Sequence, residues 1–240
     1  MGRLPGVVPI EMSDWLQVDD AYAAQMAYRM QILSDRRDRV LMLNDAAIEA
    51  ADELLEMAEA QLPMLGFVQN GSNWTCPDGR KVERAGALET LAKLVQEDFL
   101  ILDKQNGAHV LMGGVLCFPA SWSLAEKFER TLDEIHAPVP EYSAVAGSVE
   151  RMFSVLRPGR PLMRMNALRY GDPDLFHPHR GSDILREVGQ LGYIRCERQT
   201  MLRLPRTGYA VFTIHTYQVP ETAVAPEALA QLIQLKERTS

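Results

Sequence analysis

The spacing of apolar positions changes several times along the 240-residue chain, between a helical period and a strand period. In the first hundred residues apolar side chains recur every three or four positions, which is typical of amphipathic helices. After residue 97, apolar stretches bounded by turn-forming residues predict strands, with helices between them. Helices are expected at 20–36, 46–62, 86–96, 123–136, 143–156 and 226–236, and strands at 99–102, 109–118, 161–170, 193–204 and 208–219.

Capping residues mark the starts of two of these helices. Asn44 or Asp45 precedes the helix expected from 46 to 62, and both are favoured N-cap residues. Ser123 and Glu126 match a capping box, so one helix is expected to run from there to residue 136.

Glycine and asparagine mark the irregular segments. The stretch 69–80 combines Asn, Gly, Ser, Pro and Asp and is expected to be a loop. Asn106-Gly107 predicts a hairpin turn between two strands. Gly113-Gly114, inside the second strand, predicts a bulge or a close backbone approach.

The order of elements predicts the fold class. A two-stranded hairpin, several helices and three further antiparallel strands indicate an α+β fold with a sheet packed on helices. We assign residues 1–96 to an N-terminal helical extension packed on the core and residues 97–240 to the core itself. No Pro-, Gly- or Ser-rich linker separates them, so one continuous domain is expected.

Composition narrows the functional class. A net charge of −7 argues against nucleic-acid binding, which requires clustered Lys and Arg. No apolar run is long enough to cross a bilayer, no signal-peptide pattern opens the chain, and the three cysteines are scattered. We therefore expect a cytoplasmic protein. No motif for a self-contained flavin, nicotinamide or nucleotide site is present.

His136 is the most informative single residue. Pro138 and Pro140 follow it, and they are expected to end the preceding helix and to stiffen the chain there. Such a histidine suits a fixed metal ligand. By local pattern alone, a solvated or capping histidine is the commoner case, and both interpretations stay open.

The strand at 193–204 carries charge where apolar residues are expected. Because side chains alternate along a strand, Glu197 and Arg198 point to opposite faces. Either the strand is an exposed edge protected by charges, or Arg198 stabilises an oxygen or anion in an apolar pocket. Arg164 is a lone charge among the apolar residues of 162–166, and the same two alternatives, an exposed position or a pocket, apply to it.

Other histidines give weaker signals. His177 and His179 could chelate a metal, although a surface position is the commoner role for such a Pro-containing loop. His215 lies in a predicted strand, and its period alone does not choose between the interior and solvent.

A set of segments along the chain is characteristic in combination. They are 15–19, 95–99, 116–127 (Leu-Cys-Phe-Pro-Ala-Ser-Trp-Ser-Leu-Ala-Glu-Lys), 135–140 (Ile-His-Ala-Pro-Val-Pro), 164–166, 197–205 (Glu-Arg-Gln-Thr-Met-Leu-Arg-Leu-Pro) and 211–214. Together, and in this order, they resemble the haem-dependent oxidative N-demethylase family, alpha-subunit-like.

The resemblance implies a fold, a cofactor and an activity. The family's fold is PAS-like, a five-stranded antiparallel sheet with helices inserted between its second and third strands. Its cofactor is haem b, and its activity removes a methyl group from a small secondary amine with O₂. Electrons come from NADPH through FMN and a 2Fe-2S cluster, which are expected here on a partner reductase because this chain has no carrier motif.

The resemblance also implies roles for single residues. His136 becomes the proximal ligand of the haem iron, and Trp122 and Phe118 are expected to line the haem pocket. Glu197 and Arg198 become the catalytic residues, with Arg198 stabilising bound dioxygen and Glu197 orienting an ammonium substrate. Which of these two faces the haem is left open. Arg164 is expected at the distal site or against a propionate.

The remaining apolar wall is expected from residues of five segments. They are Leu116, Phe128, Leu132, Phe153, Met163, Met165 and Phe212.

Two positions depart from the family pattern. Ala167 stands where members usually carry Trp, and His215 replaces an arginine often seen in the final strand. Both changes leave the substrate undecided. A haem-based PAS sensor of gas or redox state is the alternative, and an interaction protein without haem is a third hypothesis. A homo-oligomer is among the possible assemblies, and the oligomeric state is left open.

Overall fold

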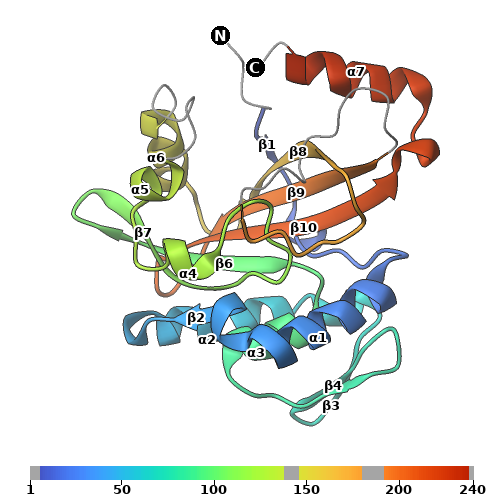
Figure 1. Ribbon diagram of the computed structural model, residues 1–240. Coiled ribbons are helices and arrows are strands. Elements are labelled where there is room, and N and C mark those ends of the chain that lie inside the picture. The colour runs from blue at the N-terminus through green and yellow to red at the C-terminus, as the bar shows by residue number, and fades with distance from the viewer. Residues whose placement is uncertain (1–5, 138–145, 180–191, 238–240) are drawn as a thin grey trace.

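Two antiparallel sheets and surrounding helices make up the structure, a computed structural model that describes residues 6–137, 146–179 and 192–237 (Figure 1). The larger sheet has seven strands in the order β1-β8-β9-β10-β6-β7-β2, and the smaller has the order β3-β4-β5. The α+β prediction is therefore confirmed. The expected count of five strands is corrected to seven, because β1 (Val8–Pro9) and β2 (Leu41–Leu43) pair with the outer edges of β8 and β7.

The five long strands of the larger sheet agree closely with the predicted ones. They are β6 (Asp98–Gln105), β7 (Ala108–Val115), β8 (Leu162–Tyr170), β9 (Tyr193–Arg203) and β10 (Ala210–Pro220).

Glycine supports the β6–β7 pairing in the two predicted ways. Asn106 and Gly107 have φ of 51° and 91°, as the predicted hairpin turn requires. A Cβ atom at Gly114 would lie 2.6 Å from the Phe99 carbonyl oxygen, and the register shifts between Ile101 and Leu102. The predicted close approach is therefore confirmed, and the bulge lies beside the two glycines, at Met112.

The N-terminal helices lie on one side of the larger sheet: α1 (Tyr22–Val40), α2 (Ile48–Glu59) and α3 (Ala87–Leu94) (Figure 1). Short 3-10 turns at Met12–Asp14, Asp45–Ala47 and Leu62–Leu65 join them to the rest of the chain. Asn44 caps the second turn by accepting a hydrogen bond from the Ala46 backbone N–H at 2.9 Å, as predicted.

The prediction of a loop at 69–80 is wrong in part. Strands β3 (Val68–Asn70), β4 (Asn73–Thr75) and β5 (Lys81–Val82) occupy this region, and their turns use the Gly and Asn residues that suggested a loop. Trp74 on β4 is 2% exposed and packs this polar segment against the hydrophobic core.

The helix expected from 123 to 136 is also corrected. It is broken into α4 (Leu124–Lys127) and α5 (Leu132–His136), with Glu129 at a φ of 59° between them. Ser123 makes no side-chain cap bond, whereas Thr131 and Glu134 form a complete capping box. Pro138 and Pro140 lie outside the described residues.

Two further helices complete the chain. Helix α6 (Ala146–Ser154) lies beside α5, and α7 (Pro226–Glu237) follows β10 after a 3-10 turn at Glu221–Ala223 (Figure 1).

Alternating residues of the central strands divide the interior into two cores. Phe99, Ile101 and Leu202 pack with α1 to α3, and we call this cluster the N-terminal core. Their neighbours along the strands pack on the other face with α4 to α6, and we call that cluster the inserted-helix core. Its buried members are Leu100, Leu102, Leu111, Leu116, Leu124, Leu132, Ile135, Phe153, Leu156, Met201, Ala210 and Ile214.

Candidate functional site

His136 is the last residue of α5, at the edge of the inserted-helix core. Its Nδ1 lies 2.8 Å from the backbone oxygen of Leu132, one turn earlier in the same helix. Because a carbonyl oxygen only accepts, Nδ1 must carry the proton, and Nε2 of the neutral ring therefore carries the lone pair. This is the tautomer in which Nε2 can bind a metal ion.

The surroundings of His136 favour the neutral form. Burial lowers its pKa, the Leu132 hydrogen bond opposes that shift, and the cationic groups of Lys127 and Arg164 lower the pKa further. A neutral imidazole is the form that metal ions require.

Helices α4 and α5 hold one another through Lys127. Its ammonium donates to the Ile135 backbone oxygen at 2.7 Å and lies 5.3 Å above the centre of the Trp122 ring. Trp122 packs against the inserted-helix core, on the His136 side of the sheet. Trp122, Lys127 and His136 are therefore brought together by the two short helices.

Arg164 on β8 and Gln199 on β9 are directly opposite one another and face this same side. The Arg164 Nε donates to the Gln199 side-chain oxygen at 2.6 Å. Burial lowers the pKa of Arg164, and the nearby Glu197 carboxylate acts in the opposite direction. The cation is thus half-buried beside His136 and is bonded to a neutral amide.

Glu197 belongs to this face and is tightly held. Its Oε2 accepts from Gln199 at 2.9 Å and from Asn166 at 3.2 Å, and its Oε1 lies 3.3 Å from the Arg195 guanidinium. Glu197 is 4% exposed and Arg195 is fully buried. We call Asn166, Arg164, Glu197, Gln199 and Arg195 the polar wall.

Arg195 is a member of the polar wall that sequence reasoning did not single out. Its guanidinium also donates to the backbone oxygens of Phe118, Pro119 and Leu175. Strand alternation places Arg195 on the same face as Glu197, and this is the one feature of the sequence that could have pointed to it. Its carbonyl partners come from distant segments, which the sequence pattern does not reveal.

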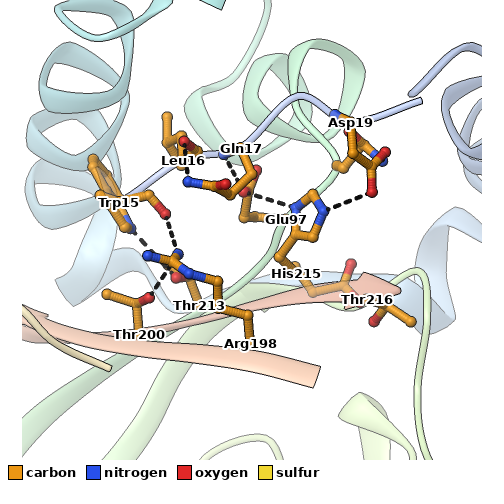
Figure 2. A network of polar contacts seen from close by, with 12 residues as sticks. Trp15, Leu16, Gln17, Asp19, Glu97, Arg198, Thr200, Thr213, His215 and Thr216 are labelled. Atoms are coloured by element: carbon orange, nitrogen blue, oxygen red, sulfur yellow. Dashed lines mark hydrogen bonds and ion pairs between the residues drawn. The ribbon is translucent and has the colours of Figure 1, made fainter. Parts of the chain in front are cut away.

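Arg198 does not join this site. It lies on the opposite face, where its guanidinium donates to the backbone oxygen of Trp15 at 2.9 Å and to Thr200 at 3.3 Å (Figure 2). It also donates to the backbone oxygen of Asp14. The Trp15 indole in turn donates to Thr213 at 3.3 Å. Arg198 therefore fastens the N-terminal segment to the sheet.

Phe118 also lies away from His136. It belongs to the N-terminal core, where its ring stacks on Tyr28 at 6.0 Å and the Arg29 guanidinium lies 5.2 Å above it.

The other residues expected to line a pocket are divided by the sheet. Met163 and Met165 pair with Thr200 and Arg198, so they face the Arg198 side. Those that pack in or on the inserted-helix core are Leu116, Leu132, Phe153 and Phe212.

His215 is a buried ion-pair residue on the Arg198 face. Its Nδ1 lies 3.0 Å from Glu97 and its Nε2 lies 3.3 Å from Asp19 (Figure 2). Burial alone would lower its pKa, but the hydrogen bonds to Asp19 and Glu97 outweigh burial and raise the pKa to about 9. A cationic His215 therefore links β10 to the N-terminal segment and to the start of β6.

His177 and His179 do not form the predicted metal chelate. His177 Nε2 lies 2.7 Å from the backbone oxygen of Asp174, and His179 is exposed. Among residues 6–137, 146–179 and 192–237, no three His, Cys, Asp or Glu side chains gather as metal ligands. The helices of these same ranges include none that is long and apolar enough to cross a membrane.

One pocket, of about 320 Å³, lies between α1, α3 and β5. Met30, Arg80, Lys81, Val82, Glu83 and Lys93 line it, so it contains none of the predicted site residues.

A comparison with known protein families agrees with this arrangement of segments. The family model described as haem-dependent oxidative N-demethylase, alpha subunit-like, matches residues 6–237, which is nearly the whole chain. The predicted resemblance is therefore confirmed, and the protein belongs to this family, which is named for a haem-dependent oxidative demethylation and for an alpha subunit.

Proposed function

We propose that the protein is a haem-dependent monooxygenase subunit of the oxidative N-demethylase type. It acts on a small amine with O₂ and receives electrons from a partner reductase. The observation that carries this proposal is the Nδ1–H···O=C bond from His136 to Leu132, which prepares Nε2 for iron. Family membership supports the same assignment.

The residues around His136 fit a haem. The inserted-helix core supplies an apolar wall, as the porphyrin faces require, and Trp122 packs against it. Lys127 and Arg164 place positive charge near the histidine, as two propionates require. A neutral imidazole, an apolar wall and nearby cations form a donor set suited to haem b.

The fold supports the proposal as well. Strands β7, β6, β10, β9 and β8 are consecutive neighbours in the sheet, and α4, α5 and α6 are inserted between β7 and β8. We propose that these five strands and three helices form a PAS-like core with the haem on the inserted-helix face.

Each group of residues has its own role in this proposal. When bound, haem supplies the iron chemistry of O₂ and accepts electrons. His136 holds the iron, and the buried leucines and Phe153 exclude water from the site. The Glu197 carboxylate accepts a hydrogen bond from the amine N–H and so orients the methyl group, while Asn166 and Gln199 fix that carboxylate.

Arg198 was predicted to be a catalytic residue, but in this proposal it has a structural role. Its bonds to the Trp15 and Asp14 carbonyls keep the N-terminal segment on the sheet. The electron carriers FMN and 2Fe-2S are proposed on the partner subunit, as the alpha-subunit description of the family suggests.

An absorption titration with haemin tests the proposal. The purified protein is expected to take up one haem with a Soret band of histidine ligation that shifts on dithionite reduction and CO addition. His136→Ala is expected to lose this band, whereas His179→Ala, at an exposed position, keeps it. Unchanged haem binding by His136→Ala would remove His136 from the ligand role.

A second measurement separates an enzyme from a haem sensor. With O₂, NADPH and a flavin/iron–sulfur reductase, the haem-loaded protein is expected to release formaldehyde from a secondary amine. Haem binding without formaldehyde from any amine would favour the sensor.

A further inference from the structure

The charges of the polar wall do not balance. Arg164 and Arg195 are guanidinium cations, and Glu197 is the wall's only carboxylate. From the helices, the cationic Lys127 and the exposed carboxylate of Asp133 lie near the neutral His136. From β10, the residues beside the wall are Ile214, Thr216 and Gln218, which carry no charge. The region therefore has an excess of positive charge.

Glu197 is already compensated by Arg195. Arg195 is fully buried and is held by three backbone carbonyls, so it cannot turn away to another anion. Among the described residues, no carboxylate other than that of Glu197 lies within 4.0 Å of the Arg195 guanidinium. A free alkylammonium ion at Glu197 would compete with this fixed guanidinium.

Arg164 carries the uncompensated charge. Its Nε donates a hydrogen bond to the neutral Gln199 amide, and no carboxylate of residues 6–137, 146–179 or 192–237 lies within 4.0 Å of its guanidinium. The two terminal NH₂ groups of a guanidinium form a fork that matches the two oxygens of a carboxylate. A half-buried guanidinium that forms no ion pair with the described residues is suited to bind an anion.

We infer that Arg164 binds a carboxylate supplied by a ligand on the His136 face, and that this site does not select a free dialkylammonium ion. The carboxylate belongs to one of two sources, a haem propionate or a substrate that carries both an amine and a carboxylate, such as an N-methyl amino acid. Gln199 bonds to both Arg164 and Glu197, so the carboxylate and the amine of one such molecule would meet adjacent groups. The inference rests on the proposed function for the identity of the ligand.

The carboxylate site is tested first on the haem-free protein. Acetate, N-methylglycine and dimethylammonium chloride are titrated while the Arg164 Nε–H resonance is followed by ¹⁵N NMR. Acetate and N-methylglycine are expected to shift it, and dimethylammonium is not. Arg164→Gln is expected to weaken acetate binding about tenfold or more, and Arg164→Lys is expected to weaken it less. Arg157→Gln, at an exposed position, should leave acetate binding unchanged.

The source of the carboxylate is tested with haem and with haem dimethyl ester, whose propionates are blocked. If the source is a propionate, wild type prefers haem to the ester and Arg164→Gln loses that preference. If the source is the substrate, Arg164→Gln binds haem and the ester with the same relative affinity as wild type does. N-methylglycine, however, no longer perturbs the Soret band of Arg164→Gln.

Two results would overturn the inference. One is acetate binding that is equal in wild type and Arg164→Gln, or absent in both. The other is dimethylammonium binding that is lost in Glu197→Gln. If wild type took up neither haem nor its ester, the proposed function would fail, while the acetate titration would still decide on Arg164.

Discussion

Glu197 and Arg198 are neighbours in β9, yet they serve opposite faces of the sheet. The Glu197 carboxylate lies in the polar wall beside Asn166 and Gln199, whereas the Arg198 guanidinium reaches the Trp15 and Asp14 carbonyls. The two residues that the family resemblance assigned to catalysis therefore occupy different environments. One faces the candidate haem site, and the other holds the N-terminal segment in place.

Arg198→Gln is expected to destabilise the protein without a matching loss of haem affinity. The substitution leaves the Trp15 and Asp14 carbonyls without their charged donor, which should cost about 2 to 4 kcal/mol in the free energy of unfolding. Urea denaturation measures the stability, and haemin titration measures the affinity. A large loss of haem affinity at unchanged stability would instead assign Arg198 to the haem site.

His215 should make stability depend on pH between about 6.5 and 9. Its folded pKa of about 9 lies above the ordinary value of 6.5, so its ionic contribution is complete below 6.5 and is lost as pH rises through 9. The shift corresponds to an upper value on the order of 3 kcal/mol. Asp19, whose pKa is lowered, stays ionised throughout this range, and the pKa of the adjacent Tyr217 is raised above 10.

Urea denaturation of wild type and His215→Gln at several pH values checks this dependence. The variant should be less stable than wild type at pH 6.5, and the difference should shrink toward pH 9.5. Parallel curves for the two proteins over this range would show that His215 is not the group that titrates.

The capping box at the start of α5 should influence haem binding through His136. Thr131→Ala removes the side-chain acceptor for the Glu134 N–H, at a cost of about 1 kcal/mol in helix stability. Because α5 has only five residues, fraying should disturb the Leu132–His136 bond and weaken haem affinity several-fold. Ser123→Ala is the matched control, since Ser123 makes no such cap bond and should change neither quantity.

Gly114→Ala should destabilise the sheet. The added methyl group would lie 2.6 Å from the Phe99 carbonyl oxygen, a backbone atom of the paired strand, so the two strands must separate locally. We expect a loss of about 1 to 3 kcal/mol in the free energy of unfolding. Gly147→Ala in α6 meets nothing within 4 Å and should be neutral or slightly stabilising. Equal thermal midpoints for the two variants would contradict this packing argument.

Sequence patterns alone predicted the order of the long strands, the hairpin at Asn106-Gly107 and the close approach at Gly113-Gly114. These features follow from local rules, because backbone conformation at a turn and side-chain alternation along a strand depend on adjacent residues. They did not predict the break between α4 and α5. There the capping box at Thr131 and Glu134 prevailed over the one expected at Ser123 and Glu126.

The sequence by itself determined that Glu197 and Arg198 diverge, that His136 ends a helix segment, and that the chain resembles its family. Only the tertiary structure decided which layer covers each face of β9, since strand alternation does not specify what packs against either side. It also decided that Arg195 compensates Glu197 and that Arg164 meets a neutral amide, because those partners come from separate strands and loops. Charge balance in a buried site depends on such distant contacts, and local sequence patterns do not encode them.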